Sequence, residues 1–254
     1  MKRVLVLGGS GALGRVVCRG LIDAGARVAL TWWRGEAAAE ALRGEVAAAV
    51  QVDLGGEGVE AAVDEAAEAL GGLDALVHSA AIGIRPGLTP PGDRHQVMRE
   101  VTLEDWEAMM NLNVRSAFLA CRRASEIMRA QREGAASIEG GSSGGDLILV
   151  GSIDGVKPVP SPVHYAASKA ALGGMARAMA KELGRENIRV NVVAPGMMDR
   201  GLSQIAPAAL VREYEKHSGL RRRSAPEEVA SVVCWLALSN TYLTGETIAV
   251  DGGL

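Results

Sequence analysis

The sequence predicts an α/β fold, a doubly wound parallel sheet of about seven strands with helices on both faces. Three observations lead to this prediction. Short apolar runs rich in β-branched residues alternate with Ala-rich stretches of helical pattern along the chain. A glycine-rich turn follows directly after the first apolar run. No shift in composition divides the 254 residues, so we expect one domain over residues 1–254.

Each predicted strand is a short apolar segment, and a predicted helix follows most of them. In chain order, the strands are expected at Arg3–Leu7, Arg27–Thr31, Val50–Val52, Ala75–His78, Leu147–Gly151, Arg189–Val193 and Thr247–Val250. The helices are expected at Ala12–Ala24, Glu36–Gly44, Glu57–Leu70, Thr102–Glu133, His164–Gly184 and Pro226–Leu238. Because crossovers between parallel strands are right-handed, this alternation covers both faces of the sheet with helices.

Composition excludes several classes of protein. The formal net charge of −3 argues against a general nucleic-acid binder, whose phosphate contacts need a basic excess. Three scattered cysteines without a CxxC pair indicate free thiols rather than a zinc site or a disulfide framework. The N-terminal apolar run is too short for a signal peptide, and no uncharged stretch reaches the roughly 18 residues of a membrane span. We therefore expect a cytoplasmic protein with no membrane partner.

The turn after the first strand reads GGSGALG, and Gly9, Gly11 and Gly14 satisfy the pattern G-x-G-x-x-G. Such glycines allow a tight turn, close approach of the backbone to a pyrophosphate, and close packing of helix on strand. Free N–H groups at the start of the helix then meet the phosphate charge. The pattern alone also fits a flexible turn, but its place between strand and helix predicts a dinucleotide site of the Rossmann type.

The residues after the second strand bear on which nicotinamide cofactor binds. A site for NAD usually presents Asp or Glu to the ribose 2′-hydroxyl about 20 residues past the last glycine. This chain has Arg34 there instead, and a guanidinium suits the 2′-phosphate of NADP. We therefore expect NADP, with NAD as the alternative. Asp53, after the third strand, is either an acceptor for the adenine amino group or a helix N-cap.

A second group of residues indicates acid–base chemistry. Tyr165 and Lys169 lie four residues apart in a helical pattern, which places both side chains on one face. A nearby ammonium favours the phenolate, so we expect Lys169 to lower the pKa of Tyr165 from its usual value near 10. Ser152 ends the fifth strand, where ligands bind in open α/β sheets. Asn113 lies in the long helical pattern upstream and is a candidate to act through a water.

Together these residues resemble the classical short-chain dehydrogenases/reductases over nearly the whole chain. The resemblance includes the glycine turn, Asp74, the segment DWEAMMNLNVRSAFL with Asn113, the Ser152, Tyr165 and Lys169 set, Pro195-Gly196, PEEVA and LTGETIAVDGG. Within that family the sequence is most similar to the 3-oxoacyl-(acyl-carrier-protein) reductases. This resemblance implies hydride transfer between a nicotinamide and a carbonyl or alcohol carbon.

The resemblance also assigns roles to individual residues. It implies that Tyr165 is the acid or base, that Ser152 orients the substrate oxygen, that Lys169 acts on Tyr165 and the nicotinamide ribose, and that Asn113 completes a proton relay through water. It implies no metal. The cofactor-binding residues that it implies are Gly8, Ser10, Gly11, Leu13, Gly14, Arg34, Asp53, Leu54, Ser79, Ala80, Tyr165, Lys169, Pro195 and Gly196.

Several positions depart from the family pattern. Leu7 stands where the family has Thr, Ala12 replaces the middle glycine, Ala81 replaces the glycine of the NNAG motif, and Arg200 replaces a Thr that follows PG. Gly11 also stands where many NADP-dependent relatives carry Arg or Lys. These departures keep a second class of function open, a dinucleotide-binding sensor with little turnover.

The resemblance completes the functional prediction. We expect an NADPH-dependent reductase of a 3-oxoacyl thioester or similar ketone, as in fatty acid biosynthesis. The alternative enzyme is an NAD-dependent alcohol, sugar or steroid dehydrogenase. Residues 196–220 are expected to form a substrate lid. The helices Thr102–Glu133 and His164–Gly184 and the C-terminal strand are the usual interfaces of the family, so we also expect a homotetramer.

Overall fold

The computed structural model describes residues 1–34, 36–83, 97–135 and 144–254. Seven parallel strands form one sheet in the order β3-β2-β1-β4-β5-β6-β7, which confirms the predicted fold class. The strands are β1 (Arg3–Leu7), β2 (Arg27–Trp32), β3 (Ala48–Gln51), β4 (Ala75–His78), β5 (Gly145–Val150), β6 (Ile188–Pro195) and β7 (Thr247–Val250). The order reverses between β1 and β4, and such a switch point opens a crevice at the carboxyl ends of the strands.

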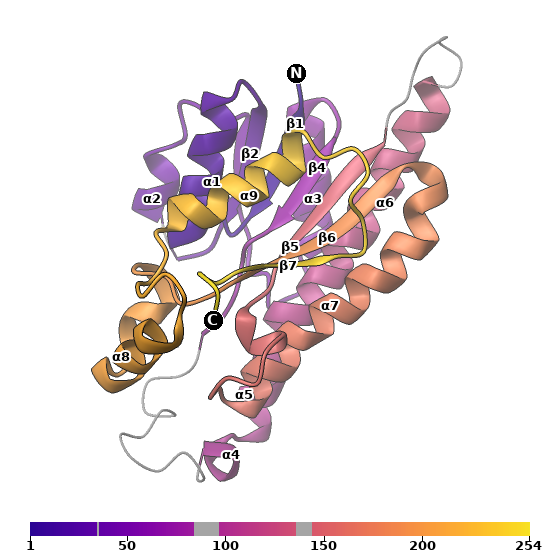
Figure 1. The fold of residues 1–254 in the computed structure, drawn as a ribbon. Coiled ribbons are helices and arrows are strands. Elements are labelled where there is room, and N and C mark those ends of the chain that lie inside the picture. The colour runs from indigo at the N-terminus through magenta and orange to yellow at the C-terminus, as the bar shows by residue number, and fades with distance from the viewer. Residues whose placement is uncertain (35, 84–96, 136–143) are drawn as a thin grey trace.

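Helices cover both faces of the sheet (Figure 1). One face packs against α3 (Val59–Leu70), α6 (Ser116–Ala135) and α7 (Val163–Leu183). The opposite face packs against α1 (Ala12–Asp23), α2 (Glu36–Glu40) and α9 (Pro226–Leu238). In β1, Leu5 and Leu7 enter the first core while Val4 and Val6 enter the second, because successive side chains of a strand point to opposite faces. Both cores are mainly aliphatic, as the scarcity of aromatic residues predicts.

The long helix predicted at Thr102–Glu133 is interrupted. Thr102 caps α5 (Leu103–Met110), and its hydroxyl accepts a hydrogen bond from the N–H of Asp105 at 3.1 Å. A π-helical segment, η1 (Asn111–Arg115), then precedes α6. Such insertions are frequent at functional sites, because they turn the side chains that follow them. Here the segment carries Asn113.

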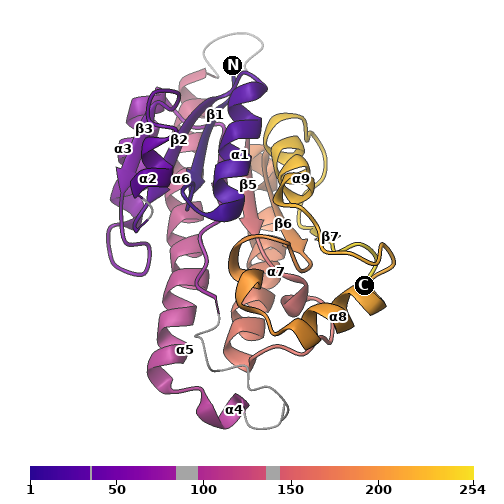
Figure 2. The same cartoon turned by 90° about the vertical axis from the view of Figure 1, so that its left-hand side faces the viewer.

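The segment expected to form a lid contains structure that the sequence analysis did not identify. It holds a 3-10 turn, η4 (Gly201–Ile205), and α8 (Ala208–His217). Both views place α8 and α5 beyond the end of the sheet toward which the strands run (Figure 2). None of the described helices combines the length and apolar character that a bilayer crossing requires.

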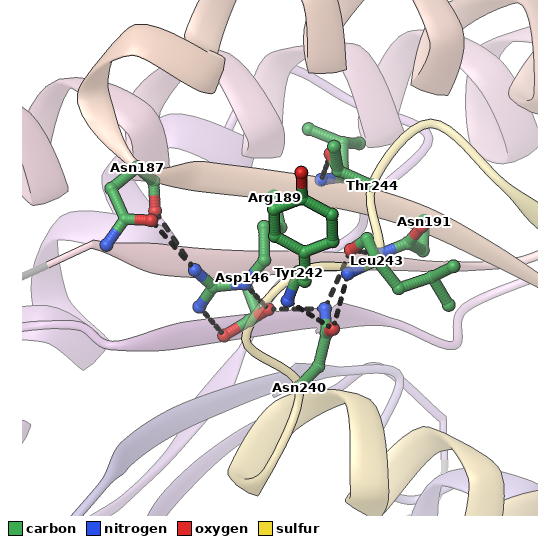
Figure 3. Close-up of polar contacts among 9 residues, drawn as sticks. Asp146, Asn187, Arg189, Asn191, Asn240, Tyr242, Leu243 and Thr244 are labelled. Carbon is green, nitrogen blue, oxygen red and sulfur yellow. Dashed lines mark hydrogen bonds and ion pairs between the residues drawn. The ribbon is translucent and has the colours of Figure 1, made fainter.

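A polar cluster closes the opposite end of the sheet, between β5, β6 and the loop before β7 (Figure 3). Asp146 of β5 and Arg189 of β6 are register partners, and two bonds of 2.8 and 2.7 Å join the carboxylate to the guanidinium. Asn240 donates to the same carboxylate at 3.2 Å and to the carbonyl oxygen of Leu243 at 2.8 Å. Asp146 and Arg189 are both buried. The cluster therefore stabilises the fold at a distance from the carboxyl ends of the strands.

Candidate active site

The glycine-rich turn has a shape that side chains would destroy. Gly8 has φ = +75°, and a Cβ on it would lie 2.7 Å from the backbone of Ala80. A Cβ on Gly14 would overlap the carbonyl oxygen of Gly8. The N–H of Gly11 donates to the Gly8 carbonyl at 3.0 Å, and the N–H of Gly8 donates to the buried hydroxyl of Thr31 at 3.0 Å. This tight cradle fits the close approach of a phosphate to the backbone.

The start of α1 suits an anion for a second reason. Gly11 is its N-cap and supplies no side-chain acceptor to the first N–H groups of the helix. Ser10 lies in the turn and is partly exposed, whereas Leu13 is buried in the apolar core between α1 and the sheet. Of these two residues, only Ser10 has a polar side chain to offer a ligand. We expect Leu13 to contribute through its backbone.

The residues that follow β2 and β3 lie at the same edge of the sheet. Arg34 is exposed, and no described residue pairs with its guanidinium. One carboxylate oxygen of Asp53 accepts a hydrogen bond from the N–H of Gly55 at 2.9 Å. The N-cap of α3 is Gly58, so Asp53 does not cap that helix. Leu54 is buried in the core beside α3.

The strands β4 and β6 supply the other predicted cofactor residues. Ser79 follows β4, and its N–H donates to the carbonyl of Leu7 at 3.0 Å, which joins the ends of β4 and β1. Pro195 ends β6, and the N–H of Gly196 donates to Val250 at 2.9 Å. A Cβ on Gly196 would overlap the hydroxyl of Tyr214 on α8. Close packing of α8 against the end of β6 therefore favours glycine at this position.

The structure brings Ser152, Tyr165 and Lys169 together at the carboxyl end of β5. Ser152 is the N-cap of the 3-10 turn η2 (Ile153–Gly155), and its side chain lies near enough to the Tyr165 phenol to affect the pKa of that group. The Lys169 ammonium donates to the carbonyl oxygen of Val150 at 3.0 Å, which holds α7 against the end of β5. It lies 5.9 Å from the centroid of the Tyr165 ring. A hydroxyl, a phenol and an ammonium in this arrangement can bind an oxygen and move a proton.

The expected effect of Lys169 on Tyr165 is wrong for this structure. Although part of Tyr165 stays accessible, burial raises the pKa of its phenol to about 12, and the charge of Asp154 raises it further. The Ser152 side chain acts in the opposite direction and lowers this pKa. Lys169 is itself buried, and burial lowers the pKa of its ammonium to about 8. The ammonium lies over the ring and is engaged by Val150, so its charge does not offset the burial of the phenol.

Asn113 connects the loop after β4 to α7. Its side-chain oxygen accepts a hydrogen bond from the N–H of Ile82 at 3.0 Å, and its amide nitrogen donates to the hydroxyl of Ser168 at 3.0 Å. Ser168 in turn donates to the carbonyl oxygen of Tyr165 at 2.8 Å. The Asn113 side chain therefore supports the helical turn that carries Tyr165.

Two further polar residues near this group were not assigned a role from the sequence. His78 ends β4, and its Nε2 lies 2.7 Å from the hydroxyl of Ser116. Burial, with a smaller effect from Lys169, lowers the pKa of this imidazole to about 3, so it is neutral. Asp154 lies two residues after Ser152 and contacts it directly. The sequence signal that could have identified Asp154 is an acidic residue two positions after the candidate serine.

Arg200, one of the departures from the family pattern, forms ion pairs in this structure. Its guanidinium pairs with Asp199 and with Glu227 of α9. In the ranges that the structure describes, no three His, Cys, Asp or Glu side chains gather closely enough to hold a metal ion.

Comparisons with known proteins agree with this geometry. A family profile described as "Enoyl-(Acyl carrier protein) reductase" matches residues 9–254. The chain is 30% identical to a 3-oxoacyl-(acyl-carrier-protein) reductase of Aquifex aeolicus, over 100% of this chain and 97% of that protein. Among solved structures, a short-chain dehydrogenase/reductase from Serratia marcescens has 30% identity and a TM-score of 0.83, over 99% of this chain and 97% of that one. A blue fluorescent protein from a metagenomic library, solved in complex with NADPH, has 32% identity and a TM-score of 0.83, with the same coverage.

Proposed function

This chain belongs to the short-chain dehydrogenase/reductase family, and we propose that it is an NADPH-dependent carbonyl reductase. The observation that carries the proposal is that Ser152, Tyr165 and Lys169 lie at the carboxyl end of β5, at the same edge of the parallel sheet as the glycine cradle that follows β1. Reduction of a ketone requires an acid–base group, a hydroxyl that binds the substrate oxygen and a turn that binds the dinucleotide, all at one edge of the sheet.

The side chains divide the work of the reaction. Ser152 binds and orients the carbonyl oxygen of the substrate. Tyr165, protonated at neutral pH because burial raises its pKa, gives its phenolic proton to that oxygen. Lys169 holds α7 against β5 through Val150, and Asn113 supports the same helix through Ser168. When bound, the nicotinamide supplies the hydride.

The proposed cofactor site consists of residues from five strand ends and from α7. Gly8, Ser10, Gly11, Leu13 and Gly14 would hold the pyrophosphate, with Asp53 and Leu54 beside the adenine. Ser79, Ala80, Pro195 and Gly196 would line the nicotinamide side, together with Tyr165 and Lys169. The exposed guanidinium of Arg34, which no described residue pairs with, supports NADPH over NADH, because its planar donors suit a 2′-phosphate. The NADPH complex of one structural relative supports the same choice.

The Arg34→Ala variant tests the choice of cofactor. We expect its dissociation constant for NADPH to rise by about 10- to 100-fold, the loss of one charge-assisted phosphate contact. Affinity for NADH should stay within about twofold, because NADH has no 2′-phosphate. Titration of nicotinamide fluorescence measures both. Arg43→Ala, which removes another exposed arginine beyond the opposite end of α2, is the control. Equal losses for the two cofactors would assign Arg34 to another role.

We propose a 3-oxoacyl thioester as the substrate, supported by the named activity of the Aquifex aeolicus relative. Purified protein with NADPH should consume acetoacetyl thioester, measured by the loss of nicotinamide absorbance. Crotonyl thioester tests the enoyl reduction named by the family profile. Turnover of alcohols with NAD alone would favour the alternative dehydrogenase. Tight NADPH binding without turnover of any of these substrates would favour a sensor.

A substrate lid and a homotetrameric assembly complete the proposal. Residues 196–220 would act as a substrate lid, supported by Tyr214 of α8, whose hydroxyl donates to the carbonyl oxygen of Asp251 at 2.9 Å.

The chain would form a homotetramer through α6, α7 and β7. Exposed Phe118 on α6 and Val163 on α7 support this interface. Light scattering in solution should give the mass of four chains, and a monomer mass would overturn the assembly.

A further inference from the structure

Asp154 is a carboxylate held directly against the hydroxyl of Ser152. Its Oδ2 accepts the hydrogen bond of Ser152 Oγ at 2.5 Å. Its backbone N–H also donates to Ser152 Oγ at 3.3 Å. The two contacts place the carboxylate beside the oxygen-binding hydroxyl, and the mechanism proposed above gives it no role.

Backbone packing holds the turn that carries Asp154 in place. A Cβ on Gly155 would lie 2.5 Å from the backbone nitrogen of Ala170 and from the carbonyl carbon of Lys169, so the turn lies directly on α7. Beyond the turn, the ammonium of Lys157 pairs with Asp251 at 2.7 Å. The position of the Asp154 backbone therefore does not depend on the charge of its side chain.

The hydroxyl of Ser152 has one hydrogen to donate. In this structure that hydrogen is directed to Asp154. A phenolate at Tyr165 would need to accept a hydrogen bond from this same hydroxyl, because a hydrogen bond donated to the charged form of the tyrosine stabilises that form. Asp154 and a Tyr165 phenolate thus compete for a single hydrogen.

The charge of Asp154 acts in the same direction as this competition. It raises the pKa of Tyr165, second only to burial. It also raises the pKa of Lys169, partly offsetting the burial that lowers it. A negative charge near both groups opposes the loss of a proton from either one.

We propose that Asp154 is a positioning residue of the proton-transfer site, which takes the hydroxyl hydrogen of Ser152 and so holds Tyr165 in its neutral, proton-donating form. The meaning of this role for catalysis rests on the carbonyl reduction proposed above. The physical claim concerns only the protonation of Tyr165, which is measurable without substrate.

Several other titratable groups lie on α7 and on the elements packed against it. On α7 itself, Lys169 lies over the Tyr165 ring, and His164 is neutral because burial lowers its pKa. Arg115 of η1 donates to Gly55, and Asp105 of α5 accepts from Thr102. Arg189 of β6 pairs with Asp146, Glu186 of η3 pairs with Arg129 of α6, and His78 of β4 near Lys169 is neutral.

Spectrophotometric titration of the tyrosines tests the proposal. The chain has three tyrosines, so the difference between each protein and its Tyr165→Phe counterpart isolates the phenol of Tyr165. Asp154→Asn keeps the shape of the side chain and an acceptor for Ser152 while removing the charge. We expect this variant to titrate about one unit lower than the wild type, which is about tenfold more phenolate at a given pH. Far-UV circular dichroism at each pH confirms that the proteins remain folded.

Two further variants make the result decisive. Asp154→Glu keeps the charge and should titrate like the wild type. Asp23→Asn removes an exposed carboxylate at the end of α1 and should also leave the titration unchanged. Coincident curves for Asp154→Asn and the wild type would overturn the proposal, as would a Glu variant that titrates like the Asn variant. If no protein reduces acetoacetyl thioester, the proposed function fails while the titration still decides the role of Asp154.

Discussion

Replacing Tyr165 by phenylalanine should reduce kcat/KM for ketone reduction by about a thousandfold. The variant lacks the phenolic hydroxyl that gives a proton to the substrate. General acid catalysis by such a group increases the rate by a factor of about 10²–10⁴. The glycine cradle and Arg34 are untouched, so the dissociation constant for NADPH should change by less than about threefold. Steady-state kinetics and fluorescence titration of NADPH measure the two quantities separately.

The chain offers a matched control for this experiment. Tyr242 is 95% exposed, and Tyr242→Phe removes the same oxygen from a residue outside the site. It should retain wild-type kinetics. If Tyr165→Phe also kept full activity, the acid–base role of Tyr165 would be wrong. If it lost NADPH binding in proportion to rate, Tyr165 would be acting through the cofactor instead of the substrate oxygen.

Replacing Asp146 by alanine should lower the free energy of unfolding by about 3–5 kcal/mol, the usual cost of leaving one partner of a buried ion pair uncompensated. Arg189, with 11% of its side chain exposed, would lose both bonds to the carboxylate, and Asn240 would lose one (Figure 3). Denaturation by urea, followed by circular dichroism, measures the loss.

An exposed ion pair provides the comparison. Glu45 accepts two bonds from Arg19, and about half of each side chain is in water. Because solvent screens such pairs, Glu45→Ala should unfold at the same urea concentration as the wild type within error. Equal losses from Asp146→Ala and Glu45→Ala would show that burial is not what makes the Asp146 pair important.

Local pattern was sufficient to predict the sheet and the glycine turn. Runs such as Val4–Leu7 are buried on both faces of the sheet, so they are apolar throughout and stand out from their surroundings. Strand ends were less certain. The predicted strand at Val50–Val52 is Ala48–Gln51 in the structure, because its backbone pairs with β2 from Ala29 to Trp32 regardless of side-chain size. The predicted helix at Glu36–Gly44 likewise ends at Glu40.

Other features depend on contacts between distant segments. The interruption at Asn111–Arg115 leaves no clear mark on the apolar pattern, so one long helix was predicted there. The helix Ala208–His217 has no fully buried residue, and its position is set by contacts such as that of Tyr214 with Asp251. Neither the interruption of the long helix nor the position of α8 depends on local sequence alone, so hydrophobic periodicity cannot predict them.

The sequence by itself determined the order of the strands along the chain, the glycine cradle and the identity of the Ser152, Tyr165 and Lys169 group. Each of these depends on residue type at short spacing. Only the tertiary structure decided the proton affinity of Tyr165, because burial and the charge of Asp154 act through space. Spacing along a helix predicts which side chains are neighbours, but it does not predict how far they are buried from water. The extent of burial matters because desolvation sets the free-energy cost of a charged side chain.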